Sequence, residues 1–316
     1  TGGVDAKLAA PMQRLREDGY QIVLSPGHQG PDDPLLPLAD IISAPVAELD
    51  RDQLEALHRK FTSGAGRLLA AQVQSQSAFK ACRDIGFDLF QGPFFKQPEK
   101  ISMDKISSSE SSRFQLLRMI EQEDPDVSEL SEIISADVSI SLRLLSYINS
   151  AAFGLRRKVQ SIREAINMLG WQHIKNWLRI LVLSDAARNQ NASELMRLSA
   201  QRGKFLEQVA EDHDFWGFNP ERLFLLGLFS LTDAMLNRAM ADIVRHLPLD
   251  ETLKSALCRQ KNNELLPFIH MVECFEDDRW DEAGARVQAL GLNAAKVNTA
   301  FQNAVDWASE MATVTA

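Results

Sequence analysis

Residues that could hold a catalytic metal are few and far apart in this sequence. His213-Asp214 is an adjacent pair of metal-binding types, but it stands in a polar stretch that we expect to form a solvated loop. No two histidines stand four residues apart, the spacing that places two imidazoles on one helix face. We therefore predict no catalytic residue, no metal ligand and no bound cofactor. The remaining histidines are singletons: His28, His58, His173, His246 and His270.

Other polar residues are candidates for contact with a partner. Arg156-Arg157-Lys158 is a compact basic turn in a chain whose net charge is −9, so it could contact an acidic protein or a phosphate. The alternative is a solvated turn between two helices. Asn149 closes an expected helix, where it either braces the following turn or joins the contact surface.

The bulk composition is that of a globular protein with room for two domains. Its 316 residues are 45% hydrophobic and 24% charged, which argues against disorder. The net charge of −9 argues against broad nucleic-acid binding, which depends on neutralising phosphates. No apolar run reaches the roughly 20 residues that span a bilayer, so we expect a cytoplasmic protein without membrane contact. The cysteines stand far apart and are expected to be reduced and structural: Cys82, Cys258 and Cys274.

The hydrophobic pattern changes along the chain. Short apolar runs alternate with two helical patterns, Asp50–Phe61 and Gln76–Ile85, which is the rhythm of βα units and a parallel sheet. Four such units form half of an eight-unit barrel. Residues 99–112 are rich in serine and are predicted to be a linker, and residues 113–316 are patterned as helices. The expected strands are Gln21–Leu24, Asp40–Val46, Arg67–Val73 and Leu89–Phe95.

The segment Gly86-Phe87-Asp88-Leu89-Phe90-Gln91-Gly92-Pro93-Phe94-Phe95-Lys96-Gln97-Pro98 resembles the close of an EAL domain, a barrel phosphodiesterase that hydrolyses cyclic di-GMP with two metal ions. The resemblance implies a partial EAL-type barrel over residues 1–98. It also implies that this barrel is degenerate, because Ser25-Pro26-Gly27-His28, Ile41-Ile42-Ser43-Ala44 and Gln72-Val73-Gln74 stand where the family has carboxylates and a lysine. Gln91 alone matches a site residue of the family, which makes it a candidate for interaction.

A second resemblance lies in the helical half. Ile133-Ile134-Ser135-Ala136-Asp137-Val138, Leu142-Arg143-Leu144-Leu145-Ser146-Tyr147-Ile148-Asn149-Ser150 and Ser161-Ile162-Arg163-Glu164-Ala165-Ile166-Asn167-Met168-Leu169-Gly170 resemble the opening of an HDOD domain. This implies a bundle over residues 113–316 that is related to the HD-type phosphohydrolases and is met in bacterial signalling. Ser230-Leu231-Thr232-Asp233 stands where a catalytic relative carries its metal-binding His-Asp pair.

These observations predict an α/β plus all-α protein that is not an enzyme. We expect a bacterial signal-transduction regulator that acts through an unidentified protein partner and is linked to cyclic di-GMP. One alternative is a cyclic di-GMP receptor without hydrolysis, and another is a metal-dependent phosphohydrolase.

Overall fold

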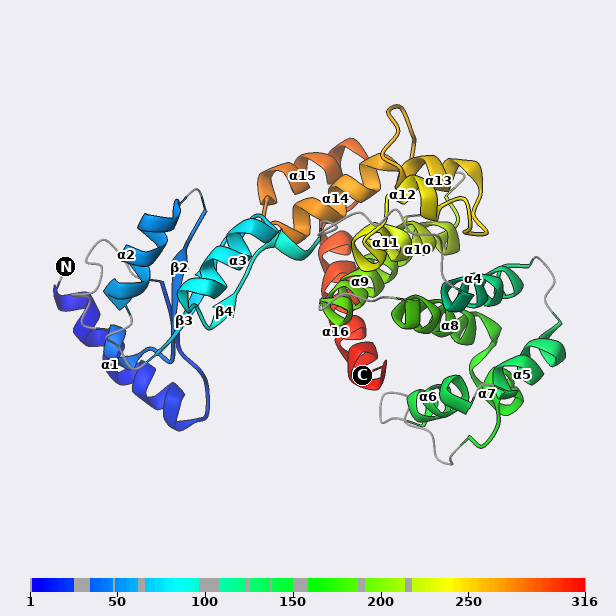
Figure 1. Ribbon diagram of the computed structural model, residues 1–316, viewed down its shortest axis with the longest axis horizontal. Coiled ribbons are helices and arrows are strands. Elements are labelled where there is room, and N and C mark those ends of the chain that lie inside the picture. The colour runs from blue at the N-terminus through cyan, green and yellow to red at the C-terminus, as the bar shows by residue number, and fades with distance from the viewer. Residues whose placement is uncertain are drawn as a thin grey trace. The chain divides into compact units, whose positions relative to one another are not determined.

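The computed structural model describes residues 2–25, 35–47, 49–61, 66–96, 108–122, 126–136, 138–149, 159–186, 191–213 and 218–315. By its internal contacts the chain divides into two units, Thr1–Gln97 and Pro98–Ala316 (Figure 1). The first unit combines a parallel sheet with helices. In the described part of the second unit, every regular element is a helix.

The sheet of the first unit confirms the predicted parallel βα pattern. Its four strands lie in the order β1-β2-β3-β4, and each pairs in parallel with the next. The four described strands do not form a closed barrel, so the EAL-type barrel that the resemblance implies stays a prediction. The elements are α1 (Gly2–Glu17), β1 (Val23–Leu24), β2 (Ile41–Pro45), α2 (Arg51–Phe61), β3 (Arg67–Ala71), α3 (Gln76–Ile85) and β4 (Leu89–Phe90), with 3₁₀ turns at Leu36–Leu38 and Pro93–Phe95.

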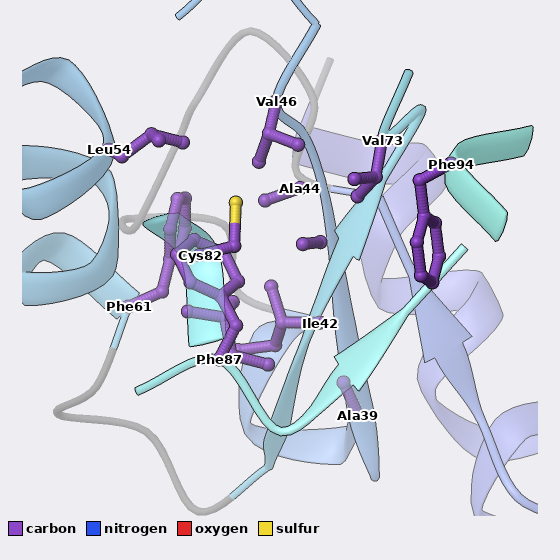
Figure 2. Packing of buried hydrophobic residues seen from close by; sticks show 12 residues of the cluster. Ala39, Ile42, Ala44, Val46, Leu54, Phe61, Val73, Cys82, Phe87 and Phe94 are labelled. Carbon is purple, nitrogen blue, oxygen red and sulfur yellow. The ribbon is translucent and has the colours of Figure 1, made fainter. Parts of the chain in front are cut away.

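The core of the first unit lies between the sheet and the two helices that follow its strands. Strand β2 is buried over Ile41–Ala44, as expected for a central parallel strand that is covered by helices. Ile42 and Ala44 of this strand gather with Phe61 of α2 and Cys82 of α3 (Figure 2). Burial in this cluster raises the pKa of the Cys82 thiol, so this cysteine is a packing residue.

The second unit is built from helices of very different lengths. Helix α4 begins at Ser108, within the segment that was predicted to be a linker. In the part of the chain that the structure describes, no helix combines the length and the apolar character needed to cross a membrane. The helices are α4 (Ser108–Ile120), α5 (Val127–Ala136), α6 (Val138–Ile148), α7 (Ile162–Leu169), α8 (Trp171–Ala186), α9 (Ala192–Asp212), α10 (Pro220–Phe229), α11 (Thr232–Leu236), α12 (Met240–Ile243), α13 (Glu251–Leu257), α14 (Leu266–Glu276), α15 (Trp280–Ala289) and α16 (Ala294–Thr315).

Helices α9 and α10 pack closely at the centre of this unit. Helix α10 is buried on all sides over Leu223–Phe229, as expected for a helix whose sequence is apolar on every face. Asn219 caps it by accepting a hydrogen bond from the Glu221 amide at 2.8 Å. At the crossing, a Cβ on Gly227 would lie 2.4 Å from the backbone carbon of Arg202 in α9. The two backbones can therefore approach this closely only because position 227 is glycine.

A buried cluster of charges joins helices α4, α8 and α10. Arg179 of α8 is fully buried, and its guanidinium donates to Glu121 at 2.6 Å, to Glu221 at 2.7 Å and to Asn176 at 2.7 Å. Lys175, one turn earlier on α8, donates to Glu221 at 2.7 Å. Since every one of these charges has an opposite partner, the desolvation cost of burying them is offset.

Replacement of Gly227 by alanine should destabilise the second unit. The added methyl group would overlap the backbone of α9, and such overpacking costs about 1–3 kcal/mol. Gly284 of α15 is the matched control, because a Cβ there meets no atom within 4 Å. Gly284→Ala should raise the free energy of unfolding by about 0.5–1 kcal/mol through helix propensity. Denaturant unfolding of both variants checks this, and equal effects would contradict the close crossing.

The charge cluster predicts a pH dependence of stability. Burial alone would raise the pKa of Glu221, but hydrogen bonds from Lys175 and Arg179 outweigh it and lower the pKa from 4.5 to about 2. A lowered pKa in the folded state contributes stability that is present above pH 4.5 and is lost as the pH falls towards about 2.

Glu221→Gln should therefore destabilise the protein most at neutral pH, and the difference from wild type should shrink below pH 4.5. Unfolding measured from pH 7 to pH 3 tests this, with Glu132→Gln on an exposed position of α5 as the control. A difference that stays constant with pH would show that the charge of Glu221 is not responsible.

Candidate functional site

The carboxyl ends of the strands are the first place to look for a site in the α/β unit, because parallel βα folds place their ligands there. Ser25 follows β1, Gln72 follows β3 and Gln91 follows β4, and all three side chains are exposed. Gln72 has a φ of 60°, a strained backbone conformation for a residue with a side chain. The Gln91 carbonyl accepts a hydrogen bond from the Val73 amide at 2.9 Å, so Gln72 and Gln91 lie on the same edge of the sheet.

The segment Ile41-Ile42-Ser43-Ala44 lies inside β2, within the predicted strand Asp40–Val46, and Ser43 is buried there. The segment does not stand at the carboxyl end of the strand, which extends to Pro45 in register with Ala71. Residues 26–34, which include His28, lie outside the described residues.

The side chains at this edge do not fit a pair of metal ions. Hydrolysis with two metals needs several anionic oxygens that converge on hard cations, whereas serine and glutamine side chains are neutral. Among the described residues no group of three histidine, cysteine, aspartate or glutamate side chains is placed to hold a metal.

In the helical unit, Ser230 is the residue that the HDOD resemblance predicts at the place of the histidine in the His-Asp pair of a catalytic relative. It ends α10 and is buried, and its hydroxyl donates to the Gly227 carbonyl at 2.7 Å. The same hydroxyl accepts a hydrogen bond from the Arg202 guanidinium at 2.9 Å. The positive charge of Arg202 therefore lies beside Ser230, the position at which the sequence predicts no metal ligand.

The charge of Arg202 is neutralised inside the protein. Its guanidinium donates two parallel hydrogen bonds of 2.7 Å to Glu276 of α14, and both side chains are almost fully buried. Burial alone would lower the pKa of Arg202, but the Glu276 carboxylate outweighs it and raises the pKa. The pair therefore stays ionised and holds α9 against α14.

The sequence predicted that His213 lies in a solvated loop, and for this residue the prediction is wrong. It follows the last residue of α9, where its Nδ1 lies 2.8 Å from the Val209 carbonyl. Its Nε2 accepts a hydrogen bond from the Asn293 amide at 3.0 Å. Both ring nitrogens are used to join the end of α9 to the start of α16, and Asp214 lies outside the described residues.

Asn149 uses both ends of its side-chain amide within the chain. The amide nitrogen donates to the carbonyls of Leu145 and Val159 at 2.8 and 2.9 Å, and the amide oxygen accepts from the Val159 amide at 2.7 Å. This geometry braces the two ends of the segment 150–158. The basic turn Arg156-Arg157-Lys158 falls in that segment and lies outside the described residues.

A pocket of about 370 Å³ in the helical unit was not anticipated from the sequence. Helix α9 supplies Lys204, Glu207 and Glu211, which recur at the spacing of one helix face. Helices α6, α8 and α16 supply the other walls, so the lining residues are far apart in the chain. Those residues are Tyr147, Gln172, His173, Asn176, Trp177, Trp307, Glu310 and Met311. The charged stripe on α9 was the one signal in the sequence that could have indicated this pocket.

Comparison with known proteins finds relatives that align with nearly the whole chain. YuxH of Bacillus subtilis (strain 168) is 28% identical over 310 residues, which cover 95% of this chain and 74% of YuxH. The cyclic di-GMP phosphodiesterase CdgJ of Vibrio cholerae is 27% identical over 303 residues, which cover 95% of this chain and 69% of CdgJ. The prediction that this chain is not an enzyme is contradicted, because a relative that aligns along both units is named as an enzyme.

A solved structure and a domain family also match this chain. A Shewanella amazonensis SB2B protein, whose name proposes a phosphohydrolase, has a similar fold with a TM-score of 0.51 at 16% identity, over 67% of this chain and 94% of its own. Residues 107–265 match the HDOD domain, whereas the resemblance of the first unit to an EAL domain remains a prediction. The helical architecture and this match together show that the chain belongs to the HDOD domain family.

Proposed function

We propose that this chain acts in bacterial signal transduction linked to cyclic di-GMP. The observation that carries the proposal is the alignment of CdgJ with 95% of the chain, since that alignment includes both the α/β unit and the HDOD domain. A relative that shared the HDOD domain alone would give no link to this nucleotide.

We further propose that the first unit is part of an EAL-type barrel. Its parallel strands follow one another in sequence order, β1-β2-β3-β4. This order is the winding of a barrel, whereas doubly wound sheets reverse direction in the middle. The segment 86–98 adds the sequence resemblance, with Gln91 at the carboxyl edge of the sheet.

The HDOD domain, in this proposal, passes the signal to a protein partner with an acidic surface. The basic residues Arg156, Arg157 and Lys158 stand between α6 and α7 in a chain with a net charge of −9. A basic turn in an otherwise acidic chain attracts partners with an acidic surface and repels partners with a basic one.

Expression of the protein in a bacterium that makes cyclic di-GMP should change an output controlled by this nucleotide, such as surface attachment. Charge reversal of the basic turn, Arg156→Glu with Arg157→Glu and Lys158→Glu, should abolish the change because the partner contact is lost. Arg245→Glu is the control, since Arg245 is an exposed arginine elsewhere in the helical unit. An unaltered output with wild-type protein would contradict the link to cyclic di-GMP, and a triple variant as active as wild type would contradict the partner contact.

Cyclic di-GMP phosphodiesterase activity is the second candidate, and the name of CdgJ favours it. Purified protein with cyclic di-GMP and Mg²⁺ or Mn²⁺ would then release the linear dinucleotide, and a chelator would stop the reaction. The charge reversal of residues 156–158 leaves the strand ends of the first unit unchanged, so it should leave this hydrolysis unaffected and remove only the partner contact.

A further inference from the structure

We propose that the pocket between α6, α8, α9 and α16 binds a small organic cation with an ammonium or guanidinium group. The volume of about 370 Å³ lies in the range of small-molecule sites, roughly 300–1,000 Å³. The pocket lies within the second unit and uses none of the strand-end residues. The inference is therefore independent of the proposed link to cyclic di-GMP.

The charges that line the pocket favour a cation. One lysine faces three glutamates, which leaves a net charge of −2 when His173 is neutral. Lys204 donates to Glu207 at 2.8 Å, and Glu207 also accepts from Asn176 at 3.2 Å, so this lysine is already neutralised. An anionic ligand such as a nucleotide phosphate would meet an excess of negative charge.

Glu211 is the carboxylate that a bound cation would neutralise. Among the described residues it has no ion pair and no side-chain hydrogen bond, although it stands one turn from Glu207 on the same face of α9. Partial burial raises the pKa of Glu211, and the neighbouring Glu207 raises it further. A cation beside Glu211 would relieve this repulsion.

Aromatic rings supply the rest of the recognition surface. Trp307 already faces a cation, because the Lys204 ammonium lies 5.9 Å from its ring centre. Tyr147 stacks on Trp177 with ring centres 5.9 Å apart, and burial followed by repulsion from Glu310 raises the pKa of this tyrosine to about 12. The phenol is therefore neutral, and rings of this kind attract ammonium and guanidinium groups through their faces.

A metal ion does not fit this lining, because no three metal-binding side chains among the described residues are placed to hold one. The indole N–H of Trp177 has no hydrogen-bond partner in the described part of the protein, but it is itself buried and does not open into the pocket. The ligand is therefore recognised through its charge.

Titration of the intact protein with argininamide, followed by calorimetry and tryptophan fluorescence, tests the proposal. Argininamide and agmatine both carry a guanidinium group and an ammonium group, whereas Nα-acetylcitrullinamide has a similar side chain and no charge. We expect argininamide and agmatine to bind and Nα-acetylcitrullinamide not to bind. A Gly-Arg-Gly amide that binds more tightly than argininamide would identify a peptide arginine as the source of the cation, and the reverse order would identify a free amine.

Glu211→Gln keeps the shape of the pocket and removes one charge, so it should weaken argininamide binding about tenfold. Glu132→Gln on α5 is the control and should leave binding unchanged. Binding should also weaken as the pH falls through the raised pKa of Glu211. Equal binding of Nα-acetylcitrullinamide, unchanged affinity in Glu211→Gln, displacement by cyclic di-GMP, or no binding of argininamide would each overturn the proposal.

Discussion

The close contact between α9 and α10 is the constraint on which the rest of the helical unit depends. Gly227 leaves no room for a side chain, and this closeness brings Ser230 within reach of the Arg202 guanidinium. The next residues of α9 turn away from this contact, so Lys204, Glu207 and Glu211 face the pocket instead. One helix therefore carries a neutralised buried charge on one side and the acidic lining of the pocket on the other.

The sequence predicted the first unit well because its signals are local. Each strand of a parallel sheet buries a short apolar run, and α2 and α3 begin and end within one residue of the predicted patterns. Helix α1 was not predicted, and each of the strands β1, β2, β3 and β4 is shorter than its predicted run. Strand ends are set by the partner strand and not by the residues alone, which is why the apolar runs overestimate the strand lengths.

The sequence could not predict the arrangement of charges in the second unit. Arg179 and Arg202 are charged residues that a pattern places on the surface, and both are buried here by partners far away in the chain, Glu121 and Glu276. Pairing of this kind depends on how the helices pack, and no local spacing encodes it. The pocket was missed for the same reason, since its walls come from four helices.

The relationship to a phosphodiesterase and the electrostatics of this chain are compatible. In the helical unit the guanidinium of Arg202 opposes a divalent cation at Ser230 through charge repulsion. At the carboxyl edge of the sheet, Gln72 and Gln91 offer neutral oxygens where a two-metal centre needs carboxylates. CdgJ extends beyond the aligned 303 residues, so its activity can use groups without a counterpart among the residues described here. A metal-dependent step in the present chain would therefore need ligands other than Ser230 and the side chains at the carboxyl edge of the sheet.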